Sequence, residues 1–282
     1  MIEIILFIFG VIFGSFVNAL VWRLHEQSLS NELSHGKQNS KENASRIQEL
    51  SIIHGRSMCP NCNHQLGPID LIPIISWVVL RSRCRYCKHP ISVSYPLVEF
   101  AVGALFVLSF IFWPYNLSSG FERLYFILWL MLLPGLTALF LYDIHWYLLP
   151  NRLLFVLAPI ALIMASIVLI ESDSSFKLIT VCLSILIGGG IFYLLFQLSN
   201  GSWIGGGDVK LGWLLGLIVL TPSKSLLVIF IAAILGTIVS IPLLLAAKLP
   251  RNKIIPFGPF LISATFIVVL FGDSILHWYT HL

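Results

Sequence analysis

The sequence predicts an all-α polytopic membrane protein of about eight transmembrane helices, with a small polar domain after the first helix. Two observations carry this prediction. Of the 282 residues, 57% are hydrophobic and only 11% are charged, whereas a soluble globular protein carries about 25% charged residues. Too few charges are present to form a water-facing surface. The composition therefore excludes an ordinary soluble enzyme, a disordered protein and a nucleic-acid binder, and leaves a helical membrane protein.

Eight hydrophobic segments approach the length of a bilayer crossing. They lie at 4–22, 95–113, 123–142, 153–170, 178–198, 209–221, 225–247 and 259–278. The sixth segment is short and follows a triple glycine, so we expect a broken or partial span there. The chain is accordingly predicted to have three parts: a first transmembrane helix (1–22), a cytoplasmic loop domain (23–94) and a transmembrane domain (95–282).

The distribution of lysine and arginine predicts the orientation. If residues 23–94 are cytoplasmic, strict alternation places fourteen of the seventeen basic residues inside and only Arg123, Lys177 and Lys224 outside. An excess of this size is typical of cytoplasmic loops. We therefore expect both termini on the opposite, non-cytoplasmic side, and a polar connector at 25–57 that is flexible or forms a short helix. No basic residue precedes the first apolar segment, which is expected to be retained rather than cleaved.

The polar stretch after the first span carries four of the five cysteines, in two C-x-x-C pairs separated by 21 residues. They are Cys59, Cys62, Cys84 and Cys87. Such pairs place four thiolates at the spacing that tetrahedral Zn²⁺ requires. A closed four-thiolate site leaves no position for water, so we expect a structural zinc. The spacer is slightly longer than is usual for a zinc ribbon, a difference that a hairpin would absorb. The alternative to a metal site is four unpaired buried cysteines. Within a metal site His64 or His89 could replace a thiolate as ligand, although a surface position is the simpler expectation for each. Cys182 lies in an apolar span and is expected to pack as a small core residue.

Two aspartates are expected at a similar depth on the cytoplasmic face. Asp143 ends the third span, and Asp208 follows the triple glycine at the start of the sixth. Two carboxyl groups in one low-dielectric site share a proton. Such a pair can cleave a peptide, because one carboxylate activates water while its protonated partner donates to the scissile carbonyl. The structural alternatives are that Asp208 caps its helix and that Asp143 is solvated at the membrane edge.

Four further residues accompany the aspartates as candidate site residues. Gly205 and Gly207 allow the backbone to unwind and another segment to approach closely. Lys210 either biases the charge of Asp208 or anchors its helix at the interface. Glu99 lies about one turn into the second span, where an anion is costly, so it is expected to be protonated or paired. Its role is open between ordering the site, contacting a substrate amine and pairing with a loop arginine.

Seven short motifs occur in order along nearly the whole chain, besides the two C-x-x-C pairs. They are Gly14–Asn18 with Arg23, Asp70–Pro73, Ser76–Trp77, Tyr95–Glu99, Asp143 with Leu149–Asn151, Gly205–Asp208 and Pro256–Pro259. Together they resemble the motifs of the type IV prepilin peptidase family, the bifunctional leader peptidases and N-methyltransferases. Gly205–Asp208 fits G-x-G-D, which presenilin-like proteases share. Two positions depart from the family pattern: Ser94 stands where many members carry arginine, and His25 where proline often occurs.

The resemblance implies an aspartic endopeptidase that removes the short basic leader of type IV prepilins or pseudopilins at the cytoplasmic membrane face. It implies that Asp143 and Asp208 are the catalytic pair and that 95–282 is the catalytic domain. It further implies methylation of the new N-terminal residue with S-adenosylmethionine, and a place in the bacterial inner membrane with both termini periplasmic. The partners would be pilin or pseudopilin precursors of pilus or type II secretion systems, and membrane lipid. No Rossmann-type glycine motif occurs, so the cofactor-binding residues stay unassigned.

Two other functions remain open from the residues. A transporter or channel would use the acidic residues to relay protons or ions, with the cysteine domain as a regulator. The inverted repeats common in transporters are not evident. A methyltransferase or assembly scaffold with a vestigial protease site is the second alternative.

Overall fold

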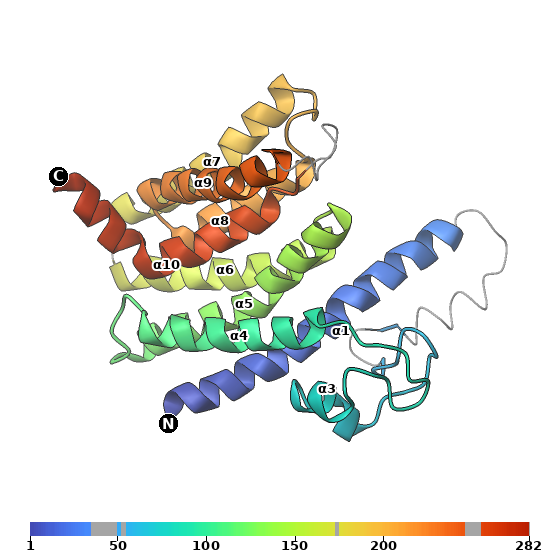
Figure 1. Cartoon of the computed structure of the whole chain (residues 1–282). Coiled ribbons are helices and arrows are strands. Elements are labelled where there is room, and N and C mark those ends of the chain that lie inside the picture. Colours follow the sequence, from blue (N-terminus) through green and yellow to red (C-terminus); the bar gives the residue numbers. More distant parts are fainter. Residues whose placement is uncertain (35–49, 52–54, 173–174, 246–254, 282) are drawn as a thin grey trace. The chain divides into compact units, whose positions relative to one another are not determined.

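Every secondary-structure element assigned to the described part of the chain is a helix, and the helices are joined by turns and loops. The computed structural model describes residues 1–34, 50–51, 55–172, 175–245 and 255–281. Its helices are α1 (Ile2–Ser34), η1 (Pro68–Leu71), α3 (Ile75–Val79), α4 (Ser94–Ile111), α5 (Gly120–Trp146), α6 (Asn151–Ser172), α7 (Ser175–Leu198), α8 (Gly206–Val219), α9 (Pro222–Leu245) and α10 (Gly258–Thr280) (Figure 1). No strand occurs in these ranges, so the predicted all-α class is confirmed.

Part of the sequence prediction falls outside the described residues. This applies to 35–49 and 52–54 of the expected polar connector. It also applies to six of the basic residues that were assigned to the cytoplasmic side: Lys37, Lys41, Arg46, Lys248, Arg251 and Lys253.

Seven of the described helices are long and apolar enough to cross a membrane: α1, α4, α5, α6, α7, α9 and α10. They correspond to seven of the eight predicted segments. The remaining predicted segment, the sixth along the chain, corresponds to α8. This helix has 14 residues and is therefore about 21 Å long, less than the roughly 30 Å hydrocarbon core of a bilayer. This agrees with the expectation of a short sixth segment, and the chain is a multi-pass membrane protein.

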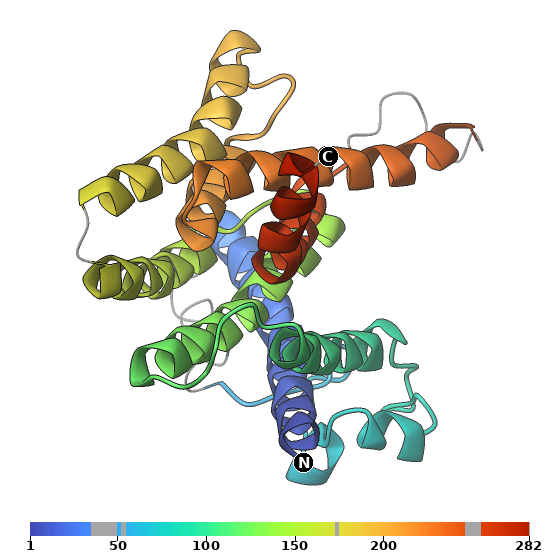
Figure 2. The same ribbon diagram turned by 90° about the vertical axis from the view of Figure 1, so that its left-hand side faces the viewer.

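The chain divides into two compact units, Met1–Phe110 and Ile111–Leu282. In the second unit α8 is the central helix, because it contacts α6, α7, α9 and α10 (Figure 1). Two buried serines connect its neighbours, since the Ser184 hydroxyl donates to the carbonyl of Gly216 (2.8 Å) and lies 2.9 Å from the Ser225 hydroxyl. Helices α9, in orange, and α10, in red, pack against each other (Figure 2). Cys182 is exposed on α7, so the expectation that it packs in the core is wrong.

The ends of α5 are defined by local hydrogen bonds. At its start the Ser119 hydroxyl accepts from the amide of Glu122 (3.1 Å), and the Glu122 carboxylate accepts from the amide of Ser119 (2.8 Å). This capping box satisfies two amide donors that the helix itself leaves free. At its end Tyr147 is in the left-handed conformation with φ 56° and donates its amide to the carbonyl of Asp143. The last turn of α5, which carries Asp143, is therefore firmly closed.

Helix α1 in the first unit is longer than the predicted span. It continues to Ser34 and so includes the first part of the segment 25–57, which the sequence predicted to be flexible or a short helix. The stretch after Arg23 contains no glycine or proline, and its buried side chains stabilise the extra turns. Gln27, which is 8% exposed, donates to the carbonyl of Leu50 (2.8 Å).

Helices α1 and α4 of the first unit meet at a point of close backbone contact. A Cβ atom at Gly14 would lie 2.6 Å from the Cα atom of Glu99. Four residues further along α1, the Asn18 side chain donates to the carbonyl of Tyr95 (3.1 Å). The Gly14–Asn18 motif therefore holds α1 against the start of α4, because glycine allows the approach and asparagine fixes the register.

We expect Gly14→Ala to destabilise the first unit by about 1–3 kcal/mol, because the added methyl group meets the backbone of α4 rather than a movable side chain. Thermal unfolding of the purified protein measures this effect. Gly67→Ala is the matched control in the same unit, since its Cβ would have only an ordinary 3.7 Å contact with Asp70. Equal unfolding temperatures for the two variants would contradict the close α1–α4 contact.

Candidate active site and metal centre

The four cysteines of the first unit form one cluster. The sulfur atoms of Cys59, Cys62, Cys84 and Cys87 all lie within 4.8 Å of one another. Tetrahedral Zn–S bonds of about 2.3 Å imply sulfur–sulfur distances of about 3.8 Å, close to the 3.9 Å between Cys59 and Cys87. Four soft sulfur ligands at this spacing fit a tetrahedral metal ion. The predicted cluster after the first helix is confirmed.

Each C-x-x-C pair lies in a short turn of the same construction. Met58 pairs with Gln65 around the first turn, and Arg83 pairs with Pro90 around the second. In each turn the residue after the second cysteine, Asn63 or Lys88, has a positive φ of 55° or 59°. The spacer between the turns contains η1 and α3. The spacer is therefore filled by a helical turn and a short helix rather than by a hairpin.

The protonation of the thiols also favours a cation at this site. Main-chain hydrogen bonding at His89, followed by donation from Asn61, lowers the pKa of Cys87 to about 6. Main-chain hydrogen bonding at His64 acts in the same direction on Cys62, but burial and the neighbouring thiols raise the pKa of Cys62 to about 11. Deprotonating all four thiols in this cluster is therefore unfavourable unless a positive charge lies between the sulfur atoms. A bound metal ion supplies that charge.

Asp143 and Asp208 both belong to the second unit. Asp143 lies in the last turn of α5 and is 5% exposed. Asp208 lies in the first turn of α8 and is half-buried. Their carboxyl groups are near enough to interact electrostatically. The fold thus brings together two acidic residues that are 65 positions apart in the sequence.

Contacts between the flanking segments hold the two aspartate motifs together. A Cβ at Gly207 would lie 3.2 Å from the Cβ of Leu149, in the segment that follows α5. The Lys210 ammonium donates to the side-chain oxygen of Asn151 (2.8 Å), at the start of α6. Lys210 therefore links α8 to the second half of the Asp143 motif. Gly205 is the residue before α8, and its carbonyl accepts from the amide of Asp208 (3.1 Å).

One carboxyl oxygen of Asp143 is buried without a partner. Its Oδ2 atom has no hydrogen bond of standard geometry among the described residues. The nearest main-chain group is Gly258, whose amide interacts with the Asp143 carboxyl group. A Cβ atom at Gly258 would lie 2.5 Å from Oδ2. Because a buried polar atom without a partner is costly, this oxygen marks the place where a proton, a water molecule or a substrate group is expected.

Gly258 was identified in the sequence only as part of the Pro256–Pro259 motif, and no site role was predicted for it. Its signal was a glycine between two prolines directly before the last apolar segment. Asn151 was likewise noted only as the end of the Leu149–Asn151 motif. Sequence periodicity does not show that α10 begins against the end of α5, so the contact between Gly258 and Asp143 was missed.

Glu99 belongs to the first unit. It lies in the second turn of α4 and is 7% exposed. Its Oε2 atom accepts a hydrogen bond from the amide of Ile74 (2.7 Å), and its side chain also interacts with the Ser15 hydroxyl. Ile74 has a positive φ of 60°, and this contact helps to hold the strained turn before α3. Glu99 therefore connects α4, α1 and the spacer between the two cysteine pairs.

The fold and the site together define a class: a polytopic membrane protein that carries a carboxyl pair in one unit and a four-thiol metal-ligand cluster in the other. Two family models match the chain. Residues 8–113 match the bacterial peptidase A24 N-terminal domain, and residues 126–241 match the type IV leader peptidase family. The chain belongs to the family of prepilin leader peptidases/N-methyltransferases.

Relatives match over nearly the whole chain. The prepilin leader peptidase/N-methyltransferase of Stutzerimonas stutzeri is 32% identical, over 95% of this chain and 90% of that protein. The protein of the same name from Aeromonas hydrophila is 30% identical, over 98% and 92%, and that from Bacillus subtilis is 29% identical, over 98% and 96%. No solved structure matches.

Gly258→Ala is expected to reduce cleavage strongly, because the added methyl group would occupy the space next to Asp143 Oδ2 and displace that carboxyl group. We expect a loss of roughly 100-fold, the size that follows from misplacing a reacting group by about 1 Å. The measurement is the rate of leader cleavage by the purified variant. Gly190→Ala on α7 is the matched control, since its Cβ has only an ordinary 3.7 Å contact. A Gly258→Ala enzyme with the rate of this control would contradict the role of Gly258.

Proposed function

We propose that this protein is a membrane aspartic endopeptidase and N-methyltransferase. It removes the leader peptide of type IV prepilins or pseudopilins at the cytoplasmic membrane face and then methylates the new N-terminal residue. The observation that carries this proposal is the interacting pair of Asp143 and Asp208, with the buried and unpartnered Oδ2 atom of Asp143. The names of the relatives, which combine both activities, support it.

In the proposed cleavage step one aspartate is ionised and the other carries a proton. The carboxylate accepts a proton from water as the water oxygen attacks the scissile carbonyl carbon. The protonated partner donates its proton to the carbonyl oxygen, which gives a neutral tetrahedral diol. Collapse of the diol breaks the C–N bond, and a carboxyl proton moves to the leaving amine. Gly258 positions Asp143, while Gly205, Gly207 and Lys210 hold the start of α8 near the segment that follows α5.

The second activity acts on the amine that cleavage exposes. The neutral form of this amine would take the electrophilic methyl group that bound S-adenosylmethionine would supply, losing one proton and leaving the thioether S-adenosylhomocysteine. Neither aspartate has a necessary part in this transfer. Cleavage and methylation are therefore expected to be separable.

We also propose how the chain is placed in its membrane. The first helix (1–22) and the catalytic region (95–282) lie in the bacterial inner membrane, the loop domain (23–94) is cytoplasmic, and both termini are periplasmic. The excess of basic residues in the loop supports this orientation. The metal is proposed to be Zn²⁺, held by Cys59, Cys62, Cys84 and Cys87 in a structural role. The substrate is a precursor whose apolar helix lies in the bilayer.

The direct experiment combines the purified enzyme in lipid nanodiscs with a prepilin and S-adenosylmethionine, and measures the intact mass of the product. We expect loss of the leader mass together with a gain of one methyl group. Methylation of a pre-cut pilin without any leader removal would instead identify a methyltransferase with a vestigial protease site. Ion flux in liposomes without any cleavage would identify a transporter or channel.

A further inference from the structure

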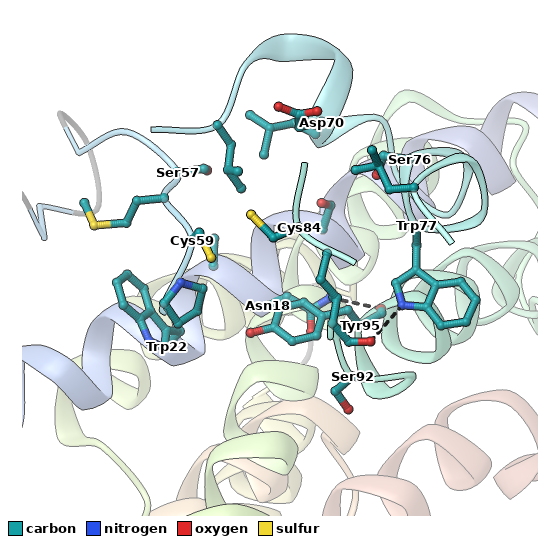
Figure 3. Close-up of a pocket in the computed structure, with 18 of the residues that line it drawn as sticks. Asn18, Trp22, Ser57, Cys59, Asp70, Ser76, Trp77, Cys84, Ser92 and Tyr95 are labelled. Carbon is teal, nitrogen blue, oxygen red and sulfur yellow. Dashed lines mark hydrogen bonds between the residues drawn. The ribbon is translucent and has the colours of Figure 1, made fainter. Parts of the chain in front are cut away.

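The first unit contains a partly open cavity beside the metal-ligand cluster. Its volume is about 470 Å³, within the range of roughly 300–1,000 Å³ that is typical of small-molecule sites. The cavity lies between α1, the two cysteine turns, α3 and the start of α4 (Figure 3). Cys59 and Cys84 form part of its wall, so the metal site supports the shape of the cavity.

Aromatic side chains from three different elements line this cavity. They are Trp22 of α1, Trp77 of α3 and Tyr95 of α4 (Figure 3). The indole nitrogen of Trp77 donates to the carbonyl of Ile91 (3.1 Å), which fixes the orientation of the ring. Aromatic faces that are held in place suit a flat heteroaromatic base and a cationic group.

Two acidic residues line the same cavity, and they differ in their partners. Asp70 forms an ion pair with Arg85 (2.7 Å). Burial raises the pKa of Asp70, but the hydrogen bonds from Arg85 and Gly67 outweigh it, and the pKa is lowered. Glu99 is 7% exposed, and among the described residues it has no lysine, arginine or histidine as an ion-pair partner. Because an uncompensated buried carboxylate is costly, this residue suits a ligand that brings its own positive charge.

We infer that this cavity binds S-adenosylmethionine, with the adenine between Trp22 and Tyr95 and the amino-acid ammonium on the carboxylate of Glu99. An ammonium group fits Glu99 better than a sulfonium does, since it can donate charge-assisted hydrogen bonds to the free acceptor positions of the carboxylate. The inference rests on the proposed methyltransferase function and names the site at which that function takes its methyl donor.

The test uses three adenosine ligands and the full-length protein in nanodiscs, with binding measured by calorimetry. S-adenosylmethionine and S-adenosylhomocysteine both carry the ammonium, whereas 5′-methylthioadenosine lacks it. Glu99→Gln keeps the size of the side chain and an acceptor for the Ile74 amide. We expect it to weaken the first two ligands roughly ten-fold or more and to leave the affinity for 5′-methylthioadenosine within two-fold, on the order expected for an unaffected contact.

Trp22→Leu is expected to weaken all three ligands, because it removes an aromatic face from the adenine. Glu3→Gln is the matched control, since it removes a negative charge from an exposed position in the same unit, away from the cavity. It should bind all three ligands like the unaltered protein. Ultraviolet cross-linking of radiolabelled S-adenosylmethionine to the unaltered protein needs no variant, and we expect the label in peptides that line the cavity.

The outcomes separate this inference from the function on which it rests. In one outcome the unaltered enzyme binds S-adenosylmethionine and methylates, and Glu99→Gln and Trp22→Leu bind it with unchanged affinity. This result would overturn the assignment of the cavity as the binding site and leave the methyltransferase function standing. Equal weakening of all three ligands by Glu99→Gln would overturn the ammonium contact, because it indicates a structural effect. An unaltered enzyme that neither binds nor uses S-adenosylmethionine would overturn the methyltransferase half of the proposed function together with the inference.

Discussion

Replacing either Asp143 or Asp208 by asparagine is expected to lower the rate of prepilin leader cleavage by roughly two to four orders of magnitude, the usual contribution of a positioned acid or base. Asparagine has nearly the same shape as aspartate, but it neither accepts a proton from water nor donates one to the carbonyl oxygen at neutral pH. Since Asp143 is 5% exposed and one of its oxygens is unpartnered, its neutral replacement is not expected to unfold the protein. Leader cleavage in nanodiscs, followed by product mass, measures the loss.

Glu122→Gln is the matched control for this experiment. It removes a carboxylate from α5, the same helix that carries Asp143, and glutamine preserves the capping box with Ser119. Its cleavage rate should equal that of the unaltered enzyme. Cleavage at the unaltered rate by both aspartate variants would show that other groups activate the water.

The second large effect is expected at the cysteine cluster. Cys84→Ser removes one of the four proposed ligands, and we expect the zinc content of the purified protein to fall from the proposed one ion per chain to nearly none. In zinc-finger peptides the metal contributes about 10–16 kcal/mol of binding free energy, which is also folding free energy. The segment from 58 to 90 contains two short turns, η1 and α3 and has few buried apolar side chains. Its structure should therefore be lost, which limited proteolysis and metal analysis by mass spectrometry detect.

Cys182→Ser separates the cluster from a general effect of cysteine loss. Cys182 is exposed on α7 and is not part of the cluster. This variant should keep its zinc and its resistance to proteolysis. A Cys84→Ser protein that also retained one zinc ion per chain would contradict the four-thiolate site.

The class of the fold was predictable because the bilayer imposes simple rules. Apolar segments of sufficient length must be helical, and seven of the eight predicted segments are long helices in the structure. The extension of α1 to Ser34 was not predictable from hydropathy. The added turns are polar and are stabilised by a tertiary contact, such as that between Gln27 and Leu50, which a scan of the sequence does not show.

The parts of the candidate site that depend on single residues, or on residues at a fixed spacing in the sequence, could be predicted. Two C-x-x-C pairs by themselves predict a tetrahedral cluster, and the four thiols do lie together in the structure. The glycine-rich segment before Asp208 indicated a close approach, which the contact of Gly207 with Leu149 provides. The contact between Gly258 and Asp143 could not be read in this way, because it joins two helix ends 115 positions apart whose adjacency depends on the packing of α10.

The cavity beside the cysteine cluster shows the same limit. Trp22, Trp77 and Glu99 come from three separate elements, and no spacing in the sequence joins them. Glu99 was recognised as a costly buried anion, but its partners were not. The structure gives it the amide of Ile74 and the hydroxyl of Ser15, and no basic side chain among the described residues.

The most direct test of the central claim, that Asp143 and Asp208 act as one catalytic pair, is a double-mutant comparison under single-turnover conditions. The leader-cleavage rate of Asp143→Asn/Asp208→Asn is compared with the rates of the two single variants. Groups that act as a unit give non-additive losses, so we predict that the double variant is no slower than the slower single variant. A double variant whose loss equals the product of the two single losses would show that the aspartates act independently, and would contradict the account.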